Sequence, residues 1–192
     1  MSPRTSAQFN EIREHTKQKI MDSALELFAN AGYYSTSISQ IAKKAGISKG
    51  LMYNYFESKE LLLKEIIFQG IDSITVSFDP NRDGILTKEE LVIFIKESFK
   101  LVRQQRTYWK LYFALMSQEA VMSLFKDELA PRLGSFFVIL TRYFHEQKYS
   151  KPEVEMRFFG ALLDGIAMNF IMDPDGFPLD EVEEKIILMY TK

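Results

Sequence analysis

The chain has no cysteine and only two histidines, and these two shortages limit the chemistry that it can perform. Without cysteine there is no disulfide, no thiolate nucleophile and no cysteine-based zinc or iron-sulfur site. The histidines, His15 and His145, lie far apart and show no paired spacing, which argues against a histidine metal site or a catalytic triad. A glycine-rich phosphate loop is missing too. The sequence therefore predicts no enzyme and no required cofactor.

Long apolar runs are also missing. No stretch of the chain approaches the roughly 18 apolar residues that are needed to cross a bilayer. The first residues carry charges at Arg4, Glu11 and Arg13 with no apolar run between them, unlike a secretory signal. We therefore expect a cytoplasmic protein with no membrane partner.

The composition is otherwise that of a folded protein with a substantial core. The chain has 192 residues, of which 46% are hydrophobic and 14% aromatic, enough for one or two compact domains. Residues 1–66 hold nine Lys and Arg against seven Asp and Glu, whereas residues 67–192 hold fifteen against nineteen. The slightly basic first third permits binding to nucleic acid without proving it.

Apolar residues recur at steps of three and four along the chain, which predicts an all-α protein. The strongest turn-forming segment, DPNRDG at 79–84, separates the front from the back. We expect a flexible arm over 1–10, a three-helix domain over 11–66 with a linker helix continuing to about 78, and a larger helical domain over 79–192. The periodic segments within these domains run over 12–31, 38–45, 49–56, 58–66, 91–102, 108–116, 121–125, 133–144, 153–172 and 179–190.

Two short predicted helices are joined by a glycine turn between Ile38 and Phe56. Gly46 suits the positive φ of such a turn, and the small Ala42 lets the helices approach. A helix-turn-helix of this kind places its second helix in the DNA major groove. That helix would expose Lys49, Gly50, Leu51, Tyr53, Asn54 and Tyr55. Of these, the lysine and the tyrosine hydroxyls suit phosphates, and Asn54 suits a base edge. The alternative is an ordinary helical hairpin with solvated lysines.

The strings ALELFANAGY, TSISQIAKKAGISKGLMYNYF and SKELL, between Ile20 and Leu62, resemble the N-terminal domain of the TetR family of transcriptional regulators. The resemblance implies a homodimer with one three-helix DNA-binding domain per subunit and a larger helical domain that receives an effector. It implies a recognition helix over Ser48–Tyr55. The residues that it implies at DNA are Ser48, Lys49, Gly50, Tyr53, Asn54 and Tyr55, with Thr36, Ser37 and Lys59 at phosphates.

The second domain is rich in aromatic residues and methionine, which can line an adaptable apolar cavity or simply form the core. A cavity of this type predicts an apolar or amphipathic small-molecule effector. Polar groups that can orient a ligand within it are Gln118, Glu119, Asn169 and Asp164. The candidate lining residues are Phe94, Trp109, Tyr112, Phe113, Met116, Phe137, Phe159 and Asn169.

By the same resemblance, the last two long helices form the dimer interface. Small residues along residues 153–172 allow close helix approach, and a two-fold face built this way packs as a four-helix bundle. The candidate interface residues are Gly160, Leu163, Ile166 and Ile187. The same residues can instead be buried within one subunit.

Residues 79–90 also fit the twelve-residue EF-hand pattern. A Ca²⁺ ion would take oxygens from this loop at Asp79, Asn81, Asp83, Ile85, Thr87 and Glu90. The alternative is a capped turn, because Thr87 and Glu90 also have the spacing of a capping box.

Two functions follow from these patterns. The first is a dimeric, ligand-responsive repressor that a small hydrophobic effector releases from a palindromic operator. The alternative is a calcium-binding helical sensor or adaptor that uses the loop at 79–90.

Overall fold

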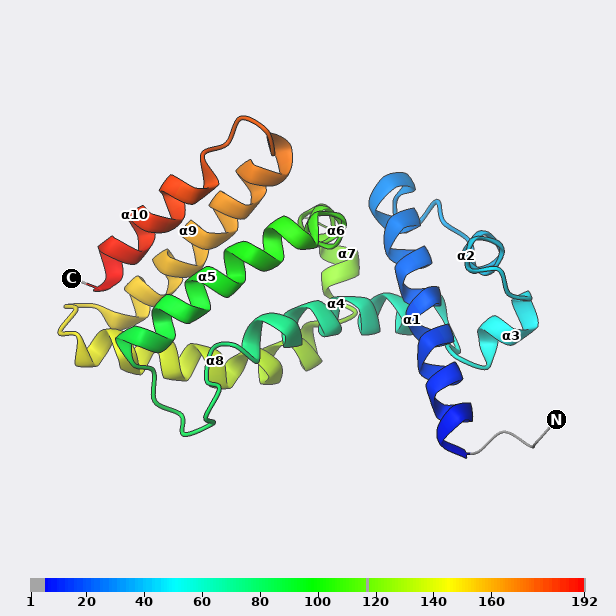
Figure 1. Cartoon of the computed structure of the whole chain (residues 1–192), viewed down its shortest axis with the longest axis horizontal. Helices are drawn as coiled ribbons and strands as arrows, with labels where there is room; N and C mark the ends of the chain where they lie inside the picture. Colours follow the sequence, from blue (N-terminus) through cyan, green and yellow to red (C-terminus); the bar gives the residue numbers. More distant parts are fainter. Residues whose placement is uncertain (1–5, 117, 192) are drawn as a thin grey trace. The chain divides into compact units, whose positions relative to one another are not determined.

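In a computed structural model, which describes residues 6–116 and 118–191, the chain is helical, and no strand occurs among those residues (Figure 1). This confirms the predicted all-α class. The helices of the described residues are α1 (Ser6–Ala31), α2 (Ile38–Ala45), α3 (Lys49–Tyr53), α4 (Lys59–Thr75), α5 (Lys88–Gln104), α6 (Arg106–Met116), α7 (Glu119–Met122), α8 (Lys126–Glu146), α9 (Pro152–Met172) and α10 (Leu179–Thr191).

The helices form two compact units, Met1–Phe68 and Gln69–Lys192. The boundary lies inside α4, so residues 69–78, which the sequence analysis assigns to a linker, belong to the second unit. Arg132 of α8 contributes to this packing because its guanidinium donates to both carboxylate oxygens of Asp72 at 2.6 Å.

The first unit is built on α1, which begins at Ser6 and not near Ile12. Residues 6–10 are therefore helical, contrary to the expected arm over 1–10, because no proline or glycine interrupts the chain between Ser6 and Ala31. Residues 1–5 of that arm lie outside the described residues. Gly32 ends α1 at a φ of 88°, as its position in the sequence predicts. Ile20, Ala24 and Phe28 of α1 are buried in the core of this unit.

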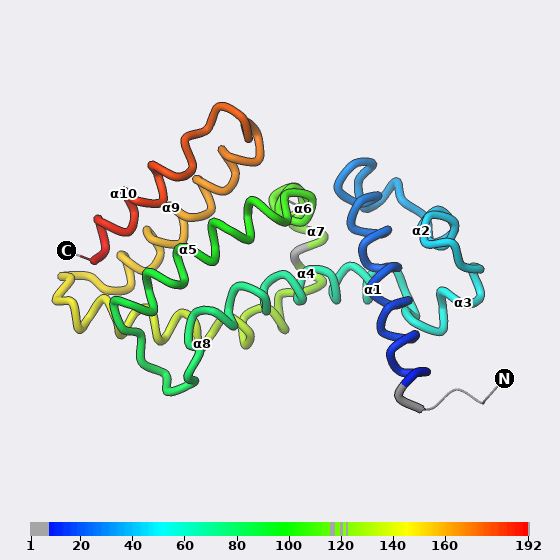
Figure 2. The backbone as a smooth tube through the Cα atoms, viewed as in Figure 1, coloured from blue at the N-terminus to red at the C-terminus, as the bar shows by residue number. Residues whose placement is uncertain are grey.

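The second unit packs α9 against α5, α6 and α8, and packs α10 against α5. The tube in Figure 2 follows the chain from α8 through a short connection into α9. Aromatic rings fill the core: Phe159 of α9 lies edge-on to Tyr190 of α10 at 4.9 Å and near Phe144 of α8 at 6.0 Å between ring centroids. Tyr143 donates to the carbonyl oxygen of Tyr190 at 3.1 Å. These contacts hold α8, α9 and α10 together.

Within the described residues, none of the helices is both long enough and apolar enough to cross a membrane.

Candidate functional site

The turn between α2 and α3 has the geometry that the sequence predicts. Ser37 caps α2 in a reciprocal capping box with Gln40, and Gly46 ends the helix at a φ of 68°. Ser48 then caps α3 by accepting from the backbone N–H of Leu51 at 3.1 Å. Met52 is fully buried and anchors the inner side of α3. The two helices therefore meet across a rigid glycine turn, which is the frame of a helix-turn-helix.

The outer side of α3 carries the side chains expected at DNA. Lys49, Tyr53 and Asn54 are exposed, and nothing within 4 Å would meet a Cβ at Gly50. The helix ends at Tyr53 with Asn54 as its C-cap, earlier than the expected end at Phe56. Tyr55 is half-buried beneath the guanidinium of Arg13, 5.2 Å from the ring centroid. The face can thus present a cation, an amide and a phenol to a nucleic acid.

Two residues expected at phosphates also have partners inside the domain. Thr36 is 2% exposed, and its hydroxyl donates to the carbonyl oxygen of Gly32 at 2.9 Å. The ammonium of Lys59 donates to the carbonyl oxygens of Tyr33 and Thr36, each at 2.9 Å, and lies over the Tyr33 ring. Both side chains therefore fix the segment between α1 and α2. The phosphate contacts expected of these two side chains stay a prediction.

The same segment exposes a tyrosine that was not among the residues expected at DNA. Tyr34 is 65% exposed, and its ring stands edge-on to that of Tyr33 at 5.2 Å between centroids. Tyr33 and Tyr34 directly precede the Ser-Thr-Ser run at 35–37. Two adjacent side chains in a tight connection face different ways, so this pair predicts one exposed tyrosine.

The loop at 79–90 has the hydrogen bonds of a capped turn. Glu90 accepts at one carboxylate oxygen from the backbone N–H of Thr87 at 2.9 Å, completing a capping box at the start of α5. Asp79 and Asp83 accept from the backbone N–H groups of Gly84 and Ile85. No group of three acidic, histidine or cysteine residues suited to hold a metal ion occurs in the described part of the chain. Of the two alternatives for this loop, the structure supports the capped turn and not the calcium site.

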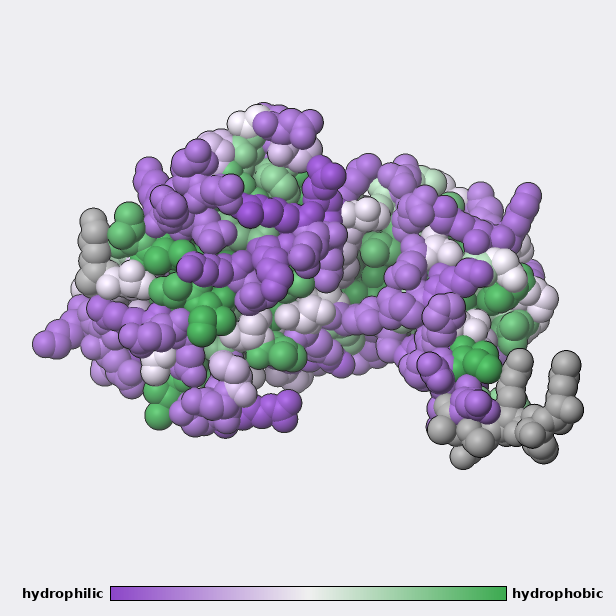
Figure 3. Space-filling model, viewed as in Figure 1, coloured by the Kyte–Doolittle hydropathy of each residue, from purple (hydrophilic) through white to green (hydrophobic). Residues whose placement is uncertain are grey.

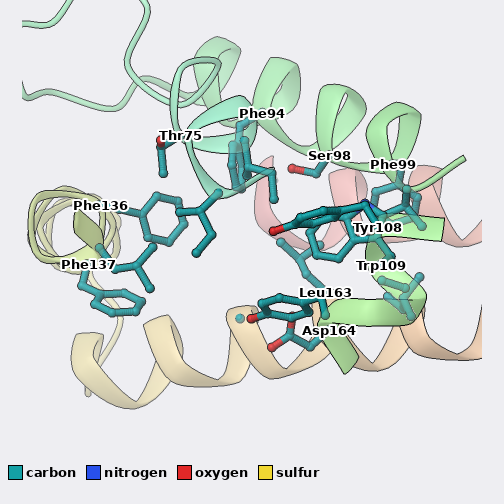
Figure 4. Close-up of a pocket in the computed structure, with 18 of the residues that line it drawn as sticks. Thr75, Phe94, Ser98, Phe99, Tyr108, Trp109, Phe136, Phe137, Leu163 and Asp164 are labelled. Carbon is teal, nitrogen blue, oxygen red and sulfur yellow. The ribbon is translucent and has the colours of Figure 1, made fainter. Parts of the chain in front are cut away.

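An apolar cavity of about 320 Å³ lies within the second unit, among α4, α5, α6, α8 and α9 (Figure 4). Four of the predicted lining residues border it: Phe94, Trp109, Tyr112 and Phe137. Further residues that line it are Ile71, Ile74, Thr75, Ser98, Phe99, Val102, Tyr108, Leu129, Leu133, Phe136, Ala167 and Leu179.

A glycine of α4 makes room for part of this wall. A Cβ at Gly70 would collide with the ring of Tyr108, so only glycine lets that ring pack against α4. The role of Gly70 was not visible in the sequence because the contact joins residues of two separate helices.

Other predicted lining residues do not border the cavity. Phe159 is fully buried among aromatic rings, Asn169 donates to the carbonyl oxygen of Gly165 one turn earlier in α9, and Phe113 does not reach the cavity. The side chain of Met116 lies outside the described residues. Helical periodicity shows which residues share a face but not which face borders a void, so the sequence did not separate Phe113, Phe159 and Asn169 from the residues that line the cavity.

Polar groups are few along the cavity wall. The indole Nε1 of Trp109 and the hydroxyl of Ser98 are buried and have no hydrogen-bond partner within the described residues. Asp164 of α9 borders the cavity with a side chain that solvent also reaches, and partial desolvation by its apolar neighbours raises its pKa above the usual value. Burial and then the negative charge of Asp164 raise the pKa of Tyr112 to about 12. Of the four predicted orienting groups, Asp164 lines the cavity, while Gln118, Glu119 and Asn169 do not.

Three residues expected at a dimer interface also border the cavity. These are Gly160, Leu163 and Ile166 of α9, and the fourth, Ile187 of α10, is half-buried. This is the other alternative that the sequence left open, in which these residues pack within one subunit. Gly160, Leu163 and Ile166 are half-buried, and their place at a dimer interface stays a prediction.

The exposed side of α9 mixes apolar residues with the polar Glu153, Arg157, Asp164 and Asn169. Figure 3 shows one face of the molecule, on which hydrophobic patches interrupt a largely hydrophilic surface. Side chains at intervals of three and four residues are exposed along α9, and two of them are small: Val154, Phe158, Ala161, Gly165, Met168 and Met172. We call this set the α9 stripe. Its spacing matches a helix face that packs against another helix.

The arrangement defines a class: a helix-turn-helix DNA-binding domain followed by a helical unit with an apolar cavity. Residues 20–66 match the family model of the bacterial regulatory proteins of the tetR family. The chain therefore carries the N-terminal domain of the tetR family, which confirms the resemblance seen in the sequence.

Individual relatives agree with this assignment. The chain is 31% identical over 85 residues to the fatty acid metabolism regulator protein of Bacillus subtilis, a match that covers 44% of each chain. It is 23% identical over 189 residues to the HTH-type transcriptional regulator YxaF of Bacillus subtilis, covering 94% of this chain and 97% of that one. These relatives are named as regulators and not as enzymes.

A solved structure shows the same fold over most of the chain. It is the transcriptional regulator FadR from Bacillus subtilis in complex with stearoyl-CoA, with a TM-score of 0.73 and 20% identity. The superposition covers 91% of this chain and 97% of FadR.

Proposed function

We propose that the chain is a ligand-responsive transcriptional regulator that binds DNA as a homodimer and represses transcription. The observation that carries the proposal is the pairing of an exposed recognition helix, α3, with an apolar cavity in a separate unit of the same chain. Such a function requires no cofactor, and a regulator of bacterial DNA works in the cytoplasm.

The recognition helix supports sequence-specific binding. Lys49 and Tyr53 suit phosphate oxygens, and Asn54 suits a base edge. Two α3 helices related by a two-fold axis would occupy successive major grooves, about 34 Å apart along the duplex. The proposed operator is therefore close to palindromic.

The α9 stripe supports the dimer. Exposed apolar side chains at helical spacing, with Gly165 and Ala161 between larger residues, suit close packing against the same helix of a second copy. In a monomer, the apolar side chains of this stripe would stay in contact with water, which is unfavourable, whereas a dimer would bury them.

The cavity supports a hydrophobic effector. Its lining is almost wholly apolar or aromatic, and the FadR structure that shares the fold is a complex with an acyl ligand, stearoyl-CoA. Helix α4 carries cavity-lining residues, Ile71 and Ile74, and also residues of the DNA-binding unit. An effector that favours one position of α4 would shift the dimer away from the DNA-binding conformation by its difference in affinity for the two states.

Selection from a library of random duplexes tests the DNA-binding part, and it works even though the operator sequence is not known. We expect the chain to enrich one near-palindromic sequence, and the double variant Lys49→Ala, Tyr53→Ala to enrich none while keeping its circular dichroism spectrum. Lys96→Ala, which removes an exposed lysine of α5, is the control and should enrich the same sequence. Failure of the unaltered chain to enrich any sequence would overturn the proposal.

A further inference from the structure

The charge of the cavity wall restricts the chemistry of the effector. Among the residues that line the cavity, Asp164 is the only acid, and no lysine, arginine or histidine occurs. The other titratable side chains on the wall are Tyr108 and Tyr112, both on α6, and burial raises the pKa of each. A ligand inside the cavity therefore meets one carboxyl group and no cation.

Aromatic rings surround the region near Asp164. Tyr108, Trp109 and Tyr112 form a cluster on α6, with ring centroids 5.3 Å, 5.4 Å and 6.4 Å apart. The negative charge of Asp164 acts on Tyr112, so the carboxyl group lies near this cluster. Figure 4 shows Asp164 on the wall formed by α9, with Tyr108 and Trp109 across the cavity from it. Aromatic faces attract cations, and they do so more strongly where water is excluded.

We propose that the effector is a cationic amphiphile, an apolar molecule with an amine or quaternary ammonium group that binds against Asp164 and the aromatic cluster of α6. The proposal rests on the proposed function, since it specifies the ligand of the same cavity. It separates this chain from a carrier of free carboxylates, because a carboxylate placed inside the cavity would face Asp164 with no cation to neutralise either charge.

Two neutral hydrogen-bond donors of the cavity wall lack a partner among the described residues and are compatible with a cationic ligand. Trp109 Nε1 and the Ser98 hydroxyl are neutral, so they can bind an ether, hydroxyl or carbonyl oxygen of the ligand but cannot neutralise a buried anion. Trp109 is 7% exposed, which leaves its N–H without water as an alternative partner. A ligand oxygen would give this donor the partner that it lacks.

The fluorescence of Trp109 gives a direct readout, because this residue is the only tryptophan of the chain. The full-length chain is titrated at pH 7.5, below micelle-forming concentrations, with three ligands of equal chain length: decyltrimethylammonium, decanol and decanoate. We expect decyltrimethylammonium to bind at least about ten-fold more tightly than decanoate, with decanol between them. Equal or tighter binding of decanoate would overturn the proposal without the need for any variant.

A charge-neutral substitution tests the assigned residue. Asp164→Asn should weaken decyltrimethylammonium binding about two- to five-fold while decanol binds as before, since only the ionic contact is removed. The matched control is Asp175→Asn, at an exposed aspartate between α9 and α10, which should change neither affinity. An unaltered ammonium affinity in the folded Asp164→Asn variant would contradict the proposal.

Release of DNA distinguishes a wrong effector from a wrong function. If decanol and decanoate release the enriched duplex and decyltrimethylammonium does not, the regulator remains and the cationic effector is wrong. If decyltrimethylammonium binds as expected but none of the three ligands releases the duplex, the ligand chemistry stands and the regulatory function fails.

Discussion

At the scale of single residues, Asp164 shows how one charge acts on both stability and binding. Its pKa lies above the ordinary value of 3.8 because apolar neighbours disfavour the carboxylate. The folded chain therefore holds this proton more tightly than the unfolded chain does. The resulting stabilisation is fully present below the ordinary pKa and is lost as the pH rises through the raised pKa.

The first prediction concerns that loss. Asp164→Asn should raise the melting temperature of the second unit slightly at pH 7.5, because the amide carries no charge to desolvate and solvent reaches only part of the side chain. At a pH well below 3.8 the carboxyl is neutral and the difference should vanish. Thermal melts followed by Trp109 fluorescence at both pH values measure it. A variant that is less stable at pH 7.5 and folded at low pH would contradict the assigned cause.

Two glycines of the helix-turn-helix make opposite predictions. Gly46 has a φ of 68°, so Gly46→Ala should destabilise the first unit by about 1 kcal/mol. Gly50 lies in α3 with open space around it, so Gly50→Ala should not destabilise the unit but should weaken DNA binding by placing a methyl group on the DNA-facing side. Denaturation followed by circular dichroism and DNA anisotropy separate the two effects. Equal stability losses for both variants would contradict this assignment.

At the scale of elements, helix ends that local chemistry marks were predicted well. Ser37 and Gly46 mark the two ends of α2, and Ser48 marks the start of α3, without a distant partner. The end of α3, which no cap of this kind marks, lies at Tyr53 and not at Phe56. The predicted start of α1 was wrong because the first turns of this helix are polar and show no apolar periodicity.

The α9 stripe gives the element-scale prediction. Met168→Glu places a charge in the proposed helix pair between subunits, so the dimer should dissociate to a 22.4 kDa monomer that keeps its helical content. Val138→Glu makes the same change at an exposed position of α8, outside the stripe, and should remain dimeric. Light scattering after size exclusion gives the mass. A Met168→Glu variant that stays dimeric would remove α9 from the interface.

At the scale of the whole molecule, the sequence predicted the order of the two domains better than it predicted which residues pack around each helix. The DNA-binding domain was predictable because its motif is local and dense. The cavity was predictable only in kind, since Phe94, Trp109, Tyr112 and Phe137 border it whereas Phe159 lies in the core beside it. The direction in which each side of α9 faces depends on how α5, α6 and α8 pack around it, and this information is not contained in the period of one helix.

The most direct test of the central claim is fluorescence anisotropy of the enriched duplex, with and without a ligand that occupies the cavity. We expect binding at about 10⁻⁸ M or tighter that weakens as salt increases, with a scrambled duplex at least about 10³-fold weaker. Decyltrimethylammonium should weaken specific binding in the unaltered chain and less in Asp164→Asn. Equal affinity for the scrambled duplex, or specific binding that no cavity ligand changes, would contradict a ligand-responsive regulator.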